Sequence, residues 1–108
     1  MKIISVQRNR EPEIKEIDGS IESMQQLVGG YIEAVYPFDD PVAIICNEEG
    51  KINGLPVSRF LYYRDSEYVD AICGTFFICG LGEEDLEDIP DNLAEKYMAM
   101  FMPDIVKI

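Results

Sequence analysis

Two arginines and three tyrosines gather between residues 53 and 68, where they could bind a small anionic ligand. An arginine presents a fork of donors that suits a phosphate or a carboxylate, and a tyrosine ring is a surface on which a base can stack. Asparagine and serine add hydrogen bonds to a ribose or a base edge. The candidate ligand-binding residues are Asn53, Ser58, Arg59, Tyr62, Tyr63, Arg64 and Tyr68. The alternative is a sheet-edge loop whose tyrosines pack on the domain and whose arginines pair with local acids.

A run of acids later in the chain is a second candidate site. Six acids occupy the nine positions from Glu83 to Asp91. Acids this close in sequence repel one another unless water or a basic partner faces them. The run therefore indicates either a solvated surface or a mimic of nucleic acid that contacts a basic partner protein. The candidate partner-binding residues are Glu83, Glu84, Asp85, Glu87 and Asp88.

Catalytic chemistry has little support in the sequence. The chain contains no histidine, which excludes hydrolases that use histidine as a base or a zinc ligand. Asp65 with Glu67 or Asp70 could act as an acid and base pair or hold a hard metal, but among 21 acids such pairs arise by chance. Gly80 and Gly82 lack the third glycine of a dinucleotide-binding fingerprint. We predict no enzyme, no metal and no cofactor.

The net charge indicates which partners the protein can bind, and the cysteines indicate the redox state of its compartment. A formal net charge of −12 repels nucleic acid and anionic membranes, so we expect no direct binding to either. Cys46, Cys73 and Cys79 are odd in number, have no C-x-x-C spacing and lie in apolar runs. This pattern favours buried thiols in a reducing cytoplasm over disulfides or a zinc site. No segment is long and apolar enough to span a membrane.

Hydrophobic periodicity and turn residues predict the elements that position these side chains. Two strands should form a hairpin over 2–7 and 13–17, followed by a helix from residue 21 that ends at Gly29 and Gly30. Residues 55–61 should form a loop or short helix. The last helix should begin within Ile89–Asn92 and end near Met102. Further strands are expected at 31–36, 42–46, 69–73 and 75–79.

The order of elements predicts an α+β fold in a single domain of residues 1–108. Its sheet should be mostly antiparallel, with about five or six strands and two main helices packed on one face.

Several blocks together resemble a known family. They are Glu16–Ser20 with Ile21 and Gln25, Gly29–Phe38, Asn47–Lys51, Asn53–Pro56, Asp70, Gly74–Ile78 and Gly80–Leu81. The chain resembles a small domain of unknown function that recurs in phages, prophages and conjugative elements. Members tend to carry Asn-Arg and then charged residues after the Leu-Pro pair. Here Ser58 replaces that asparagine, Arg59 is retained, and Tyr62 and Tyr63 replace charged residues.

The resemblance implies no activity, but its genetic setting implies a counter-defence protein that acts by binding in the host cytoplasm. Within that class we favour a sponge for a small nucleotide immune signal, such as a cyclic ADP-ribose isomer or a cyclic dinucleotide. In such a sponge, Arg59 and Arg64 would bind phosphates while Tyr62, Tyr63 or Tyr68 stacks on a base. Tight enclosure of the ligand predicts a homo-oligomer.

Two other hypotheses remain open. The protein could be an acidic inhibitor of a host defence protein, such as a CRISPR effector or a restriction enzyme, and its binding should then weaken steeply with salt. It could also be a non-catalytic accessory domain of a larger complex.

Overall fold

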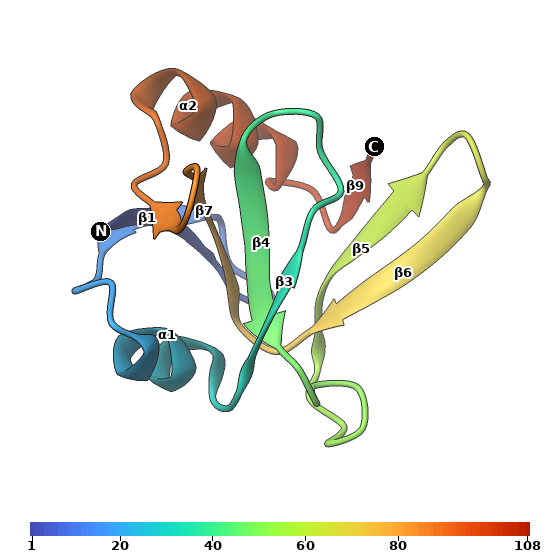
Figure 1. The fold of residues 1–108 in the computed structure, drawn as a ribbon. Helices are drawn as coiled ribbons and strands as arrows, with labels where there is room; N and C mark the ends of the chain where they lie inside the picture. The colour runs from blue at the N-terminus through green and yellow to red at the C-terminus, as the bar shows by residue number, and fades with distance from the viewer.

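A computed structural model describes residues 1–108, and its chain forms two β-sheets and two α-helices (Figure 1). In chain order the elements are β1 (Lys2–Val6), β2 (Glu13–Glu16), α1 (Ile21–Val28), β3 (Ile32–Val35), β4 (Val42–Asn47), β5 (Val57–Tyr63), β6 (Tyr68–Cys73), β7 (Phe76–Leu81), β8 (Leu86–Glu87), α2 (Asp91–Met100) and β9 (Ile105–Lys107). The predicted α+β class is confirmed.

The larger sheet has six strands in the order β2-β1-β7-β4-β3, with β8 paired to β7. All of its pairs are antiparallel, and Ile78 of β7 lies opposite both Ile4 of β1 and Ile44 of β4. This sheet matches the predicted number of strands and their direction. β1, β4 and β7 are apolar almost throughout because both faces of the sheet are covered.

The two helices cover opposite faces of this sheet, as Figure 1 shows. On one face, Met24 and Val28 of α1 belong to a core of 7 buried residues. On the other face, Ala94 and Tyr97 of α2 belong to a core of 14 buried residues. The expectation that both helices share one face was therefore wrong. Since successive residues of a strand point to opposite faces, an apolar strand needs cover on both.

The first helix has the boundaries that its flanking residues predict. Ser20 is the N-cap, and its hydroxyl accepts a hydrogen bond of 3.0 Å from the backbone N–H of Ser23. Gly29 ends the helix in the left-handed conformation with φ of 80°, and its N–H donates to the carbonyl of Gln25. α2 likewise starts and ends within the predicted limits.

A second sheet of three strands, in the order β6-β5-β9, was not predicted. β5 and β6 form an antiparallel hairpin, and β9 adds to β5 in parallel. Leu61, Ile72 and Val106 reach from this sheet into the larger core. The expected loop or short helix at 55–61 is largely strand. The sequence pattern did not predict this strand for two reasons. Arg59 is buried while Phe60 is exposed, and the strand pairing shifts register between Val57 and Arg59.

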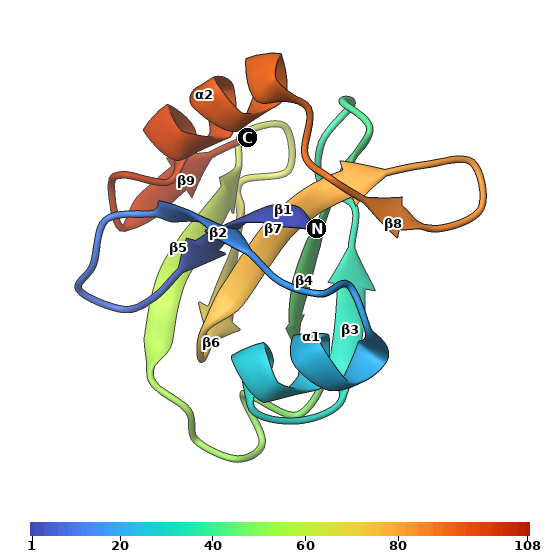
Figure 2. The same cartoon turned by 90° about the vertical axis from the view of Figure 1, so that its left-hand side faces the viewer.

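Figure 2 shows two hairpin loops that project to opposite sides of the molecule, one between β1 and β2 and the other between β7 and β8. The predicted hairpin of β1 and β2 is confirmed. Neither helix is long and apolar enough to cross a membrane.

Candidate ligand-binding cleft

A cleft of about 540 Å³ opens between the two sheets beside α2. Its walls come from the loop between β3 and β4, the tip of the β5–β6 hairpin, α2 and the residues around β9. The lining residues are Pro37, Phe38, Asp39, Asp40, Tyr63, Arg64, Asp65, Ser66, Lys96, Tyr97, Met100, Lys107 and Ile108. Figure 1 shows these segments in the upper part of the molecule, with α2 at the left and the tip of the β5–β6 hairpin at the right. This volume lies within the range of small-molecule sites, roughly 300–1,000 Å³.

Three basic side chains line the cleft, and together they form what we call its basic rim. Arg64, Lys96 and Lys107 also line a second, shallower hollow on the other side of Met100. They are a third of the 9 Lys and Arg residues in a chain of net charge −12. Arg64 and Lys107 form no ion pair within the protein. This rim is therefore a local basic patch on an acidic protein, and two of its three charges are available to an anion.

The loop between β3 and β4 forms an acidic wall of the cleft with Asp39 and Asp40. Oδ2 of Asp40 accepts hydrogen bonds from Nζ of Lys96 at 2.6 Å and from the hydroxyl of Tyr97 at 2.8 Å. The hydrogen bond from Lys96 has the larger effect and that from Tyr97 the smaller, and together they hold the pKa of Asp40 below its ordinary range. Burial and the neighbouring Asp40 raise the pKa of Tyr97. Asp39, beside Asp40, is exposed and forms no ion pair or side-chain hydrogen bond.

Aromatic rings support both walls. The ring of Phe38 lies 4.8 Å from that of Tyr97, at an interplanar angle of 59°. At the hairpin tip, the rings of Tyr63 and Tyr68 lie 6.0 Å apart. Tyr63 is half-buried and packs against the larger core, which fixes one side of its ring. A flat ligand ring could contact these side chains at little entropic cost, since their rotamers are already restricted.

The structure brings together three of the seven predicted ligand-binding residues. Tyr63 and Arg64 line the cleft, and Tyr68 contacts Tyr63 at its edge. Tyr62 points to the other face of β5, because neighbouring residues of a strand alternate in direction. Asn53 is exposed in the loop at the opposite end of β5. Neither of these last two residues lines the cleft.

Ser58 and Arg59 have structural contacts instead. Ser58 is buried, and its hydroxyl donates to the carbonyl of Gly74 at 2.6 Å. Arg59 is only 1% exposed, and its guanidinium donates to four backbone carbonyls. Those carbonyls belong to Gln7, Arg10, Ser58 and Phe101. Burial lowers the pKa of Arg59, while the charge of Asp104 acts in the opposite direction.

Four further charged residues of the cleft were not predicted from the sequence: Asp39, Asp40, Lys96 and Lys107. Their positions are 39–40, 96 and 107, so no window of the sequence contains them together. The only local signal is the pair of acids between Pro37 and Pro41, which reads as an ordinary turn. The unpredicted strand β9 places Lys107 beside the hairpin tip, because Lys107 pairs with Tyr62 in a parallel ladder.

The five predicted partner-binding acids lie in and after the loop that joins β7 to β8, which projects from the molecule in Figure 2. All five are exposed. Asp85 accepts from the backbone N–H of Leu86, and Asp88 accepts from that of Lys2 at 3.0 Å. These two carboxylates therefore also help to hold the local backbone. The other three, Glu83, Glu84 and Glu87, form no hydrogen bond or ion pair.

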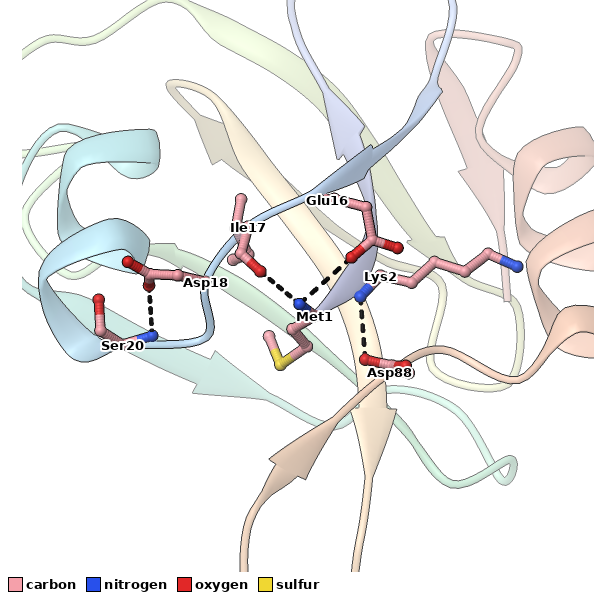
Figure 3. A network of polar contacts seen from close by, with 7 residues as sticks. All are labelled: Met1, Lys2, Glu16, Ile17, Asp18, Ser20 and Asp88. Carbon is pink, nitrogen blue, oxygen red and sulfur yellow. Dashed lines mark hydrogen bonds and ion pairs between the residues drawn. The ribbon is translucent and has the colours of Figure 1, made fainter.

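Figure 3 shows the network around the first residues, which explains the role of Asp88. The amino group of Met1 donates to the carbonyl of Ile17 and lies 3.4 Å from the carboxylate of Glu16. Asp18 accepts from the backbone N–H of Ser20 at 2.7 Å, at the start of α1. Because the partners of β1 include both β2 and the segment after β8, this network connects the acidic hairpin to the sheet.

The cysteines differ in burial. Cys46 and Cys79 are buried, and desolvation raises the pKa of these thiols to about 11 and about 12. Cys73 is only partly buried, so the expectation of three core thiols was wrong for this residue. No group of three or more Cys, Asp and Glu side chains is placed to hold a metal ion.

Comparison with known families covers almost the whole chain. A family model described as a domain of unknown function, DUF3846, matches residues 1–102. The chain belongs to the DUF3846 family. The predicted resemblance to a family of unknown function is thereby confirmed. Searches of curated proteins and of solved structures find no match. The DUF3846 match ends before β9, so Lys107 and Ile108 of the cleft lie beyond it.

Proposed function

We propose that this protein binds a small anionic ligand with a flat ring, of the nucleotide class, in the cleft between its two sheets, and that it does so without transforming the ligand. The observation that carries the proposal is the basic rim, where Arg64 and Lys107 have no ion-pair partner in a chain of net charge −12. A phosphate would bind there by charge-assisted hydrogen bonds.

The shape of the cleft agrees with such a ligand. Its volume of about 540 Å³ suits a nucleotide-sized molecule. The half-buried ring of Tyr63 stands next to Arg64 on the hairpin tip, so a base could stack while the phosphate reaches the rim. The predicted pair of stacking tyrosine and phosphate-binding arginine is thus retained in Tyr63 and Arg64, whereas Arg59 is occupied elsewhere.

The biological role follows from the setting that the sequence resemblance implies. In a phage or mobile element, a protein of this kind would remove a nucleotide immune signal of the host, such as a cyclic ADP-ribose isomer or a cyclic dinucleotide. The cleft is open on one side, and a sponge must hold its ligand tightly. We therefore include self-association in the proposal, with a second subunit closing the site.

The test is thermal unfolding and calorimetric titration with a panel of cyclic nucleotides and cyclic ADP-ribose isomers, together with the mass of the native assembly. A ligand that binds only the folded state stabilises it by about 2.7 kcal/mol at a hundred times its Kd. The ligand should be recovered intact. Arg64→Ala should weaken binding about tenfold or more, because it removes a charge-assisted hydrogen bond.

The matched control is Arg10→Ala, which removes the same charge from an exposed side chain outside the cleft that forms no ion pair. It should leave the affinity unchanged within about twofold. Equal affinity of the wild type and of Arg64→Ala would place the ligand elsewhere. Absence of binding by the whole panel would refute the proposed function.

A second candidate function rests on the acidic hairpin. Glu83 and Glu84 of the projecting loop and Glu87 of β8 are exposed and have no side-chain partner within the chain. Such a loop suits a nucleic-acid mimic that occupies the basic groove of a CRISPR effector or a restriction enzyme. Inhibition of the enzyme should then fall steeply as salt rises.

This second function has its own control. Replacing these three glutamates by glutamine should abolish the inhibition. The same replacement at Glu11, Glu22 and Glu95, which are exposed elsewhere, should not. Inhibition that survives the first triple variant would exclude the hairpin.

A further inference from the structure

The cleft is electrically asymmetric, and this restricts which ligand it can take. Arg64 and Lys107 lie on the side of the hairpin tip and β9, whereas Asp39 and Asp40 lie on the loop between β3 and β4. The third basic residue, Lys96, already donates to Asp40. A ligand that spans the cleft therefore meets the two unpaired cations at the end that also carries Asp65, and at the other end it meets carboxylates whose neighbouring cation is already paired.

The carboxylates of this acidic wall have acceptor capacity to spare. Only Oδ2 of Asp40 is used, by Lys96 and Tyr97, and Oδ1 of Asp40 accepts no hydrogen bond. Asp39 accepts none from any side chain or backbone group. An ionised carboxylate can only accept hydrogen bonds. A ligand atom placed against this wall gains from being an N–H donor and loses from being a carbonyl oxygen.

We infer that the ligand is a nucleotide whose base carries an amino group, with its phosphate at Arg64 and Lys107 and its amino N–H groups at the wall of Asp39 and Asp40. This inference rests on the proposed function and specifies its ligand. Aromatic side chains line the cleft at both ends, because Phe38 and Tyr97 lie beside Asp40 and Tyr63 lies beside Arg64.

The opposite orientation is disfavoured. It would place a phosphate against Asp39 and Asp40, where like charges repel, and it would leave the two free cations of the rim without a partner. A base with a keto oxygen in place of the amino group would also present one acceptor to another. A site built to accept hydrogen bonds from a ligand discriminates against an analogue that lacks the donor, because its polar groups are then left unpaired.

The experiment uses two matched pairs of nucleotides that differ only in whether C6 of the purine carries an amino group or a hydrogen. One pair is adenosine and purine riboside monophosphate, and the other is cyclic di-adenosine monophosphate and its analogue with two unsubstituted purines. Affinities are measured by calorimetry for the full chain and for two variants. For the wild type we expect the adenine compound of at least one pair to bind about tenfold more tightly than its partner.

The variant Asp39→Asn should reduce this preference to about twofold or less, since an amide can donate as well as accept. The control is Asp65→Asn, which removes a carboxylate from the hairpin tip beside Arg64. It should strengthen the binding of both compounds alike and leave the ratio unchanged, because it acts on the phosphate end.

The outcomes separate the two proposals. If both compounds bind in a way that depends on Arg64, but with equal affinity or with a ratio that Asp39→Asn does not change, the inference about the base is wrong and the proposed function stands. If no nucleotide of either pair binds, the inference about the base is wrong, and the panel of cyclic nucleotides and cyclic ADP-ribose isomers decides whether the proposed function stands.

Discussion

Nε of Arg59 donates a hydrogen bond of 2.8 Å to the backbone carbonyl of Phe101, 42 positions further along the chain. The bond joins β5 to the end of α2. The same guanidinium reaches the carbonyls of Gln7 and Arg10 in the turn between β1 and β2. No ion pair compensates this buried charge, so carbonyl dipoles take that role. Arg59 thus connects three segments that are remote in sequence.

Replacing Arg59 should destabilise the fold strongly. Arg59→Ala removes the guanidinium donor from four carbonyls, two of them in buried hydrogen bonds, and we expect the free energy of unfolding to fall by about 3 kcal/mol or more. Arg59→Lys should also be destabilising, because an ammonium group cannot reproduce the planar fork of donors. Urea unfolding measures both effects. Arg10→Ala, an exposed change nearby, should cost no more than about 0.5 kcal/mol. A stable Arg59→Ala protein that loses nucleotide binding would instead make Arg59 a ligand-binding residue.

The start of α1 should give the protein a measurable acid sensitivity. Hydrogen bonds from Ser20 lower the pKa of Asp18 from 3.8 to about 2. Because this pKa is lower in the folded state, the ionised carboxylate stabilises the fold above about pH 4, and its contribution disappears as the pH falls towards 2. The difference in melting temperature between wild type and Asp18→Asn should therefore shrink over that interval.

The control for this pH series is Glu84→Gln, which removes a carboxylate that accepts no hydrogen bond. Its difference from wild type should not follow the same course. A difference for Asp18→Asn that stays constant from pH 6 to pH 2 would mean that the hydrogen bonds to Asp18 do not matter for stability.

The hairpin of β7 and β8 depends on a close approach of two backbones. A Cβ atom at Gly80 would lie 2.2 Å from the carbonyl oxygen of Asp88. Since this oxygen belongs to the backbone, Gly80→Ala must displace a strand, and we expect a loss of about 1–3 kcal/mol. The comparison variant is Gly29→Ala. A Cβ at Gly29 would meet nothing within 4 Å, so this variant measures only the backbone strain of a left-handed alanine. Unfolding in urea that ranks Gly80→Ala as harmless would contradict this packing.

Thiol reactivity should follow the burial of the cysteines. Thiolates are the reactive species, and the raised pKa values of Cys46 and Cys79 suppress them. Iodoacetamide should therefore alkylate Cys73 first in the native protein, and mass spectrometry of peptides can follow the order. Unfolding in denaturant should make all three react at similar rates. Early modification of Cys79, which is buried in β7, would argue against this core.

Local patterns predicted most of the fold. Ser20 and Gly29 define α1, and the apolar runs of β4 and β7 mark the centre of the larger sheet. The second sheet was missed for a tertiary reason. A buried arginine and an exposed phenylalanine in β5 reverse the usual alternation, and only contacts with Gln7, Arg10 and Phe101 make that reversal stable.

The candidate cleft was predicted only in part for a related reason. Tyr63 and Arg64 are adjacent in sequence, so composition could find them. The remaining groups meet only through the topology, because Lys107 arrives by a parallel strand and Asp40 by a loop that Lys96 and Tyr97 hold. Arg59 was predicted to bind a ligand for a similar reason, because its sequence neighbours include tyrosines and the sequence does not show that its side chain is buried.

In strand β9, two neighbouring residues have different roles, one in the core and one in the cleft. Val106 seals the larger core, while its neighbour Lys107 lines the cleft. Both follow the last residue of the family match, at position 102. A homologue with an apolar residue in place of Val106 and a different residue in place of Lys107 would keep the fold but present a different charge to the ligand. A three-residue strand outside the family match would then be the place where the ligand preference can change without a change of fold.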